Sequence, residues 1–161
     1  MIKQLAHSAV SDIFSLNSGV VYRIPKYQRE YTWGIKDWEA LFNDVTENDF
    51  GYFLGSYICV NSGSINGTTL EVIDGQQRLT TISLLLLAMY NLMHNGIIEP
   101  ESKILPEKIY EEYLIDKWQP EETRIKLKPV KNDQKAFGKL FDDADEHVKG
   151  SNLTANYNYF Y

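Results

Sequence analysis

This sequence of 161 residues has only one cysteine, and it lacks long apolar runs and an excess of positive charge. Its one cysteine, Cys59, cannot form an internal disulfide or a cysteine-based zinc site. The longest apolar run, residues 84–90, is much shorter than the roughly 20 residues that cross a bilayer. The N-terminus also lacks the apolar core of a signal peptide, so we expect a cytoplasmic protein without a membrane partner.

The charge balance is acidic, with 16 Lys and Arg against 22 Asp and Glu and a formal net charge of −6. Non-specific DNA binding usually needs the opposite sign, because contacts to phosphates drive it. An acidic chain can still bind a nucleotide or DNA through one local basic site. Apolar residues make up 43% of the chain, which is typical of a globular domain and supplies a core.

The first two thirds of the chain alternate between strand and helix patterns. β-branched and aromatic residues predict strands at residues 20–24, 52–60 and 68–73, the last two forming a hairpin around the turn 61–67. Apolar spacing predicts an amphipathic helix over 35–47. A helix over 78–94 is apolar nearly all round and is therefore expected at the centre of the core. These elements predict an α+β fold, a small mixed sheet packed by helices.

We expect a core unit at residues 1–98 and the start of a mostly helical extension at 99–161. The extension should contain a helix over 107–117, a strand over 124–128 and a helix over 133–141. Residues 142–150 are acidic and are expected to be exposed. The aromatic end of the chain, residues 152–161, suggests that the chain was cut from something longer. A short helix is also expected at residues 11–14.

The junction between the strand at 68–73 and the next helix has the chemistry of an anion site. Gly75 lets the backbone approach a ligand closely, and the helix that follows presents unpaired N–H groups. Arg78 adds a planar, charged donor suited to phosphate. Further donors and acceptors surround the same turn, namely Gln76, Gln77, Thr80 and Thr81.

Asp74 is the exceptional residue of this junction, because a carboxylate repels phosphate. A hydrated Mg²⁺ ion held by Asp74 would remove the repulsion, or Asp74 could simply cap the helix. The same residues also suit an ordinary helix N-terminus with a solvated first turn. The junction is not a P-loop, since no G-x-x-x-x-G-K-[ST] run occurs in the chain.

A second group of polar and aromatic residues lies in the segment 25–33. Tyr27 could stack a base, while Gln28 and Arg29 could grip a phosphate or a sugar. The alternative is a loop whose aromatic residues plug the edge of the core. We favour that alternative for Trp33, consider it for Tyr31, and leave both interpretations open for Gln28 and Arg29.

The remaining chemically interesting side chains are interpreted as structural. The three histidines, His7, His94 and His147, lack the spacing of metal ligands. Cys59 lies in an apolar segment and is expected to be a small buried residue. Three lysines form a modest basic patch that we interpret as a solvated strand edge rather than a DNA contact: Lys126, Lys128 and Lys131.

Three short motifs within residues 10–94 together resemble the N-terminal domain of the GmrSD-type restriction proteins. This prokaryotic group has a ParB/sulfiredoxin-like nucleotide-handling domain. The segment 124–141 fits the strand and helix that follow in such proteins. The motifs are Ile24-Pro25-x-Tyr27-Gln28-Arg29-x-Tyr31-x-Trp33, then Phe53-Leu54-Gly55-Ser56, then Val72-Ile73-Asp74-Gly75-Gln76-Gln77-Arg78-Leu79-Thr80-Thr81.

The resemblance implies a domain that binds and hydrolyses nucleoside triphosphates (NTPs) with a divalent cation. It assigns Gln28 and Arg29 to a family Gln-Arg pair and residues 74–78 to an Asp-Gly-Gln-Gln-Arg signature. In full-length members an HNH-type nuclease domain commonly follows, and together the domains restrict foreign, often modified, phage DNA. His147 has no HNH pattern around it, so this chain should not cleave DNA by itself, and DNA is expected as a partner of the full-length protein.

The leading expectation is therefore an NTPase domain that regulates an attached nuclease, with Mg²⁺ held by Asp74. Arg78 would hold the phosphates, Arg29 would neutralise developing charge, and Gln28 or Gln76 would position water. The nucleotide would also meet Tyr27, Gly75, Gln77, Thr80 and Thr81. The alternatives are a non-catalytic, ParB-type switch in which a nucleotide reshapes a DNA-binding or homodimer surface, and a scaffold whose motifs are purely structural.

Overall fold

The computed structural model describes residues 9, 12–13, 19–63, 68–142 and 144–161, and the elements are named within these ranges. The short helix expected at residues 11–14 and the turn expected at 61–67 fall largely outside them. The strands are β1 (Val20–Arg23), β2 (Ile58–Asn61), β3 (Thr68–Asp74) and β4 (Leu127–Lys128). The helices are α2 (Ile35–Glu47), α3 (Gln76–His94), α4 (Leu105–Lys108), the π-helix η1 (Ile109–Leu114), α5 (Lys131–Lys139), the 3₁₀ turn η2 (Ala144–Glu146) and α6 (Asn152–Phe160).

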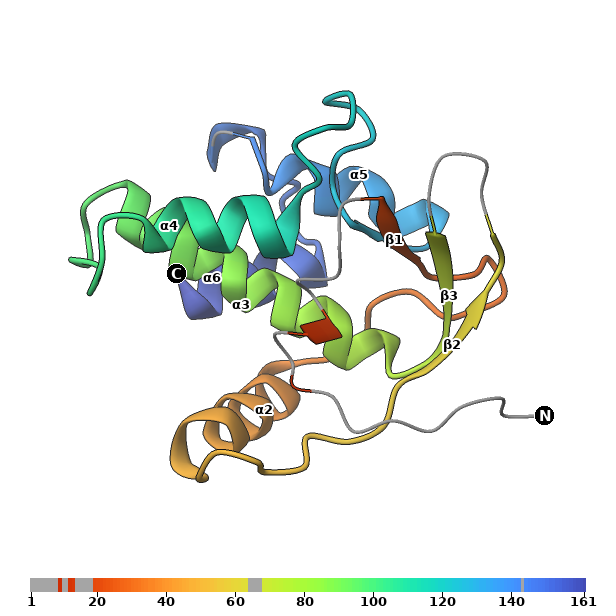
Figure 1. Ribbon diagram of the computed structural model, residues 1–161, viewed down its shortest axis with the longest axis horizontal. Coiled ribbons are helices and arrows are strands. Elements are labelled where there is room, and N and C mark those ends of the chain that lie inside the picture. The colour runs from red at the N-terminus through yellow and green to blue at the C-terminus, as the bar shows by residue number, and fades with distance from the viewer. Residues whose placement is uncertain (1–8, 10–11, 14–18, 64–67, 143) are drawn as a thin grey trace.

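One mixed sheet contains all four strands, in the order β2-β3-β1-β4. β2 and β3 form the expected antiparallel hairpin, whereas β1 runs parallel to both β3 and β4. The sheet lies on the right of Figure 1, with α3 crossing the middle of the molecule beside it. The expected α+β class, a small mixed sheet packed by helices, is confirmed. Because parallel strands share one carboxyl edge, the loops after β1, β3 and β4 lie on the same side of the sheet.

Helix α3 is the centre of the core, as the sequence predicted. Leu79, Leu84 and Leu87 on this helix are at most 1% exposed. The helix contacts α4, η1 and α6, so its apolar side chains are covered from several directions. Within the described parts of the chain, neither α3 nor any other helix is long and apolar enough to cross a membrane.

Several expected elements differ in extent. Residues 52–57 are not part of the predicted strand, which is confined to β2. The helix expected over 107–117 is the short α4 followed by η1, and the strand expected over 124–128 is reduced to β4. Helix α5 begins two residues before the predicted position 133.

Helix α6 forms the aromatic end of the chain, where no helix was predicted. The Ser151 side chain caps it by accepting a hydrogen bond from the Leu153 backbone N–H at 3.2 Å. Leu153 and Tyr157 of α6 join the same hydrophobic core as Leu79 of α3, so this core contains residues from both sides of position 98. Aromatic pairs also connect α6 to α2, namely Trp38 with Tyr159 and Phe42 with Phe160.

Removing the α6 cap should destabilise the domain measurably. Ser151→Ala deletes the acceptor for the Leu153 N–H and is expected to lower the free energy of unfolding by about 1 kcal/mol. Ser151→Asp keeps an acceptor at the N-cap and should retain most of the stability. Urea unfolding of the three proteins measures the difference, and equal stability of Ser151→Ala and the wild type would show that the cap contributes nothing.

Candidate nucleotide-binding junction

The junction between β3 and α3 has the open helix N-terminus that the sequence predicted. Gly75 is the N-cap of α3, with φ of 87° in the left-handed region that favours glycine. No side chain caps this end in the part of the chain that the structure describes, so Asp74 does not act as the cap. The first N–H groups of α3 are therefore suited to bind an anion, with the helix dipole favouring negative charge.

The loop after β1 is hydrogen-bonded directly to this junction. The Gln28 side chain donates from Nε2 to the Ile73 carbonyl oxygen at 2.8 Å. Gln76 in turn donates from its Nε2 to Gln28 Oε1 at 3.1 Å. Two motifs 45 or more residues apart are thereby joined, and the loop after β1 lies beside the start of α3.

Gln77 forms a second link between the same loop and α3. Its Oε1 accepts hydrogen bonds from the backbone N–H groups of Thr32 at 2.8 Å and Trp33 at 3.2 Å. Its Nε2 donates to the Glu30 carbonyl oxygen at 3.0 Å. The Gln77 side chain is only 6% exposed, so these bonds are made in the interior. This amide therefore fixes the position of the loop relative to the helix.

The hydroxyl groups of Thr80 and Thr81 also form hydrogen bonds within the protein. Thr80 donates to the Gln76 carbonyl oxygen at 2.8 Å, and Thr81 donates to the Gln77 carbonyl oxygen at 2.9 Å. Tyr31 lies 2.6 Å from the Thr81 hydroxyl and donates to it, since the Thr81 proton is already used. Tyr31 is buried and Trp33 is half-buried, which agrees with the interpretation that these aromatic residues fill the edge of the core. This geometry favours a positioning role for both threonines over direct contact with a ligand.

Four predicted site residues are open to solvent or nearly so. Tyr27 is 73% exposed, Arg29 and Asp74 are exposed, and Arg78 is half-buried. The Arg78 guanidinium donates a long hydrogen bond of 3.4 Å to the Ser56 carbonyl oxygen. The junction thus divides into buried amides and hydroxyls that hold the loops and exposed side chains that can meet a ligand.

Asp74 is the site's acidic group, and a metal ion there would need ligands from elsewhere. Among the residues that the structure describes, no group of three or more His, Cys, Asp or Glu side chains could hold a metal ion. Mg²⁺ commonly binds through one or two carboxylates, water and the phosphates of a substrate. One exposed carboxylate fits that mode and does not fit a site made of protein ligands alone.

Helix α5 supports the same loop from its other side. Asp133 Oδ2 accepts a hydrogen bond from the Tyr31 backbone N–H at 2.7 Å, and Asn132 donates to the Glu30 carboxylate. Burial raises the pKa of the Asp133 carboxyl, an effect opposed by the Tyr31 N–H and reinforced by the nearby Glu30 charge. The loop that carries Arg29 is therefore held between α3 and α5.

Buried tyrosines around this site should make the domain sensitive to alkaline pH. Burial raises the pKa of Tyr57 to about 12 and raises the pKa values of Tyr22 and Tyr31 further. Unfolded tyrosines lose their proton near pH 10, so between about pH 10 and 12 the folded state binds more protons. The free energy of unfolding should therefore fall with rising pH in this window, as urea titrations at successive pH values would measure.

A single variant separates this effect from other alkaline titrations. Tyr31→Phe removes one raised phenol and should make the decline above pH 10 shallower, in addition to a constant loss from its hydrogen bonds. The same slope in Tyr31→Phe and wild type would contradict the explanation.

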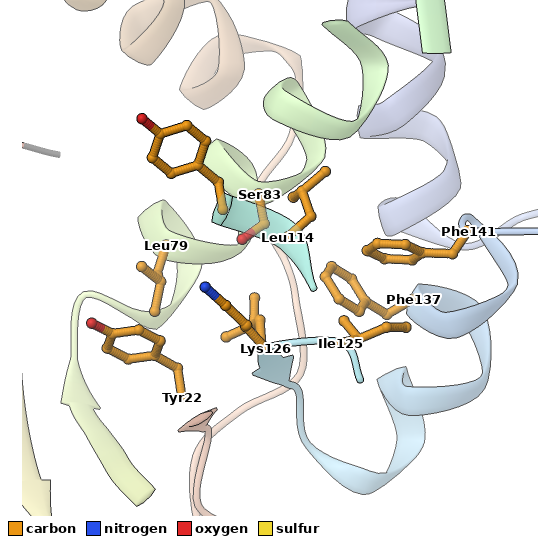
Figure 2. A pocket seen from close by; sticks show the side chains of 10 residues that line it. Tyr22, Leu79, Ser83, Leu114, Ile125, Lys126, Phe137 and Phe141 are labelled. Atoms are coloured by element: carbon orange, nitrogen blue, oxygen red, sulfur yellow. The ribbon is translucent and has the colours of Figure 1, made fainter. Parts of the chain in front are cut away.

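A small cavity beside α3, lined in part by Leu79 and Ser83, changes the interpretation of one lysine. Figure 2 shows Lys126 extending into it beside Tyr22 and Leu79. Lys126 is 6% exposed and donates to the Glu112 carbonyl oxygen, so the prediction that it belongs to a solvated strand edge is wrong. Burial lowers the pKa of the Lys126 ammonium, against the opposing charges of Asp116 and Glu112.

Cys59 and two of the histidines lie at the surface. Cys59 was expected to be buried, but it is exposed on β2, because this strand is at the edge of the sheet and all of its residues are exposed. His94 and His147 line an open groove of about 760 Å³ beside α3 and α6, together with Tyr90, Tyr157 and Tyr161. This groove lies away from the β3–α3 junction.

The sequence matches the model of one protein family over most of its length. Residues 10–161 match the model of the GmrSD restriction endonuclease, N-terminal domain. A search of curated proteins finds no match. The family match continues beyond the three motifs through β4, α5 and α6, the elements that share the core with α3. The chain belongs to the GmrSD restriction endonuclease family, whose proteins act in restriction and phage defence, and it corresponds to the N-terminal domain.

Proposed function

We propose that this domain binds and hydrolyses a nucleoside triphosphate with Mg²⁺, and that this reaction regulates a nuclease domain in the full-length restriction protein. The observation that carries the proposal is the hydrogen bond from Gln28 to the Ile73 carbonyl oxygen. It holds the loop that bears Arg29 against the helix N-terminus that precedes Arg78. In the proposed site, Arg29, Arg78 and the first backbone N–H groups of α3 would together bind a chain of phosphates.

Binding of the phosphates would depend on α3. Its first N–H groups and its dipole favour negative charge, and the N-cap residue Gly75 has no side chain that could cap these N–H groups. Arg78 adds a charge that does not titrate near neutral pH and a fork of donors. Tyr27, exposed in the neighbouring loop, would stack on the base. Since every base has a π-face, such stacking gives little base preference.

Hydrolysis would depend on the loop after β1. A water oxygen would bond to the γ-phosphorus while the bond from that phosphorus to the bridging oxygen breaks, leaving a nucleoside diphosphate and inorganic phosphate. Besides holding the loops, the amides of Gln28 and Gln76 each have a second N–H group and a further carbonyl lone pair that would orient this water, and its proton passes to the released phosphate or to solvent. Arg29 would stabilise the charge that develops during transfer. Mg²⁺ at Asp74 would offset charge on the phosphate oxygens.

Release of inorganic phosphate from each of the four NTPs, with and without Mg²⁺, tests this proposal. We expect release from at least one NTP that requires Mg²⁺. Asp74→Asn should raise the Mg²⁺ concentration needed, whereas Asp49→Asn, at another exposed aspartate, should not. Tight binding without phosphate release would favour the ParB-type switch over an NTPase. An absence of both binding and release would support a purely structural role for the motifs.

A further inference from the structure

The motif at residues 53–56 has no chemical role in the function proposed above, yet it lies against the proposed phosphate-binding arginine. The segment is not a strand, and it passes directly over the first turn of α3. Its backbone and the following tyrosine contact both Gly75 and Arg78. The third motif therefore belongs to the same junction as the other two.

Gly55 leaves space that the Arg78 guanidinium occupies. A Cβ atom added at Gly55 would lie 2.5 Å from Arg78 Nη1, 2.6 Å from Cζ and 2.7 Å from Nη2. All three distances are shorter than real Cβ contacts, so any other residue at this position would displace the guanidinium. Gly55 also has φ of +112°, which disfavours other residues.

Ser56 and Tyr57 contact the same arginine. The Ser56 carbonyl oxygen accepts a hydrogen bond from Arg78 Nη1 at 3.4 Å, and the Arg78 Cζ atom lies 5.6 Å from the centre of the Tyr57 ring. The Tyr57 ring also lies beside the helix N-cap, since a Cβ atom added at Gly75 would be 2.7 Å from its Cδ1 atom. The Tyr57 ring therefore packs against both the arginine and the N-cap of α3, so it keeps the two close together.

We infer that Gly55 and Tyr57 are positioning residues that hold the Arg78 guanidinium beside the N-terminus of α3 for binding the phosphate chain of a nucleotide. The inference rests on the proposed function, because it assumes that Arg78 binds phosphate. An arginine side chain has many rotamers, and fixing it before binding removes part of the entropy cost of ordering it. Glycine is needed at position 55 because the guanidinium occupies the space that a side chain there would fill.

The chain provides a matched control for this inference. Gly51 lies in the same connecting segment with φ of +97°, so alanine there has a similar backbone strain. A Cβ atom added at Gly51 meets nothing within 4 Å, whereas one added at Gly55 meets the guanidinium. Comparison of Gly55→Ala with Gly51→Ala therefore removes the backbone effect and leaves the displacement of Arg78.

The experiment measures the affinity of Mg²⁺-NTP and of inorganic tripolyphosphate by calorimetry. Arg78→Ala should weaken both ligands about tenfold to hundredfold, the range for a charge-assisted hydrogen bond. Gly55→Ala should weaken both by a similar factor, and Gly51→Ala should bind as the wild type does. The double variant Gly55→Ala/Arg78→Ala should bind no more weakly than Arg78→Ala alone, because both changes remove one interaction.

The outcomes separate this inference from the proposed function. If the wild type binds neither ligand, or if Arg78→Ala binds as well as the wild type, the proposed function fails and the inference fails with it. If Arg78→Ala binds weakly but Gly55→Ala binds normally, or if the two losses add, only the positioning role is overturned. Should Gly55→Ala not fold, Tyr57→Leu replaces it, with weakened binding expected and unchanged binding contradicting the inference.

Discussion

Replacing Arg29 with alanine is expected to lower the rate of NTP hydrolysis by about a thousandfold while changing NTP affinity only slightly. Arg29 is exposed on the loop that Gln28 and Gln77 fasten to the β3–α3 junction, where the proposed function puts the phosphate chain. A positive charge that acts on the transferred phosphoryl group stabilises the transition state more than the bound substrate. Single-turnover phosphate release, with affinity measured separately, distinguishes the two effects.

Lys26 provides the control for this first prediction. It is an exposed cation three residues away in the same loop, so Lys26→Ala alters the local charge by the same amount. We expect this variant to hydrolyse NTP at close to the wild-type rate. If Lys26→Ala and Arg29→Ala were slowed equally, the effect would come from the general electrostatic field, and the assignment of Arg29 would be wrong.

Gln77→Leu is expected to give the largest loss of stability among the variants considered, about 2 to 4 kcal/mol. Leucine has a similar size but cannot accept the Thr32 and Trp33 N–H groups or donate to the Glu30 carbonyl oxygen. Partly buried backbone groups would be left without their partner, and the loop would separate from α3. Urea unfolding measures the loss, and NTP affinity should fall with it because the loop carries the proposed ligand-binding residues.

Gln134→Leu is the matched control. Gln134 is exposed on α5 and donates one hydrogen bond, to the Pro129 carbonyl oxygen at 3.1 Å. Its replacement should cost less than about 1 kcal/mol. Equal destabilisation by the two substitutions would show that the three bonds of Gln77 do not anchor the loop.

Local patterns in the sequence predict the elements that depend on neighbouring residues. The hairpin of β2 and β3, the amphipathic α2 and the apolar α3 follow from alternation, turn residues and helical spacing. A helix start after Gly75 was also predicted from local sequence, because a glycine between a strand pattern and a helix pattern is typical of such a junction. The amphipathic helix has the same bounds as predicted, while α3 begins two residues earlier.

Features that depend on distant residues could not be predicted in this way. The parallel pairing of β1 with β3 and β4 joins segments far apart in the chain, which no local pattern indicates. Helix α6 was missed because its aromatic residues have weak helix propensity and are stabilised by packing on α3 and α2. The burial of Lys126 was not predicted, because it depends on a carbonyl acceptor that the distant element η1 supplies.

The candidate site shows the same division. The sequence identified the residues of the junction, and the hydrogen bond from Gln28 to Ile73 confirms that the two loops meet. The sequence did not show that Gln77 and Thr81 point inward, nor that Gly55 lies against Arg78. These roles arise from which side chain fills which space, and residue types alone do not determine that.

Equilibrium binding of Mg²⁺-NTP to the wild type, Arg78→Ala and Arg124→Ala tests the central claim most directly. Both arginines lie over a tyrosine ring, Arg78 over Tyr57 and Arg124 over Tyr110, but only Arg78 is at the β3–α3 junction. We predict that the wild type and Arg124→Ala bind the nucleotide alike and that Arg78→Ala binds it at least about tenfold more weakly. Unchanged affinity in Arg78→Ala, or an equal loss in Arg124→Ala, would contradict a phosphate site at this junction.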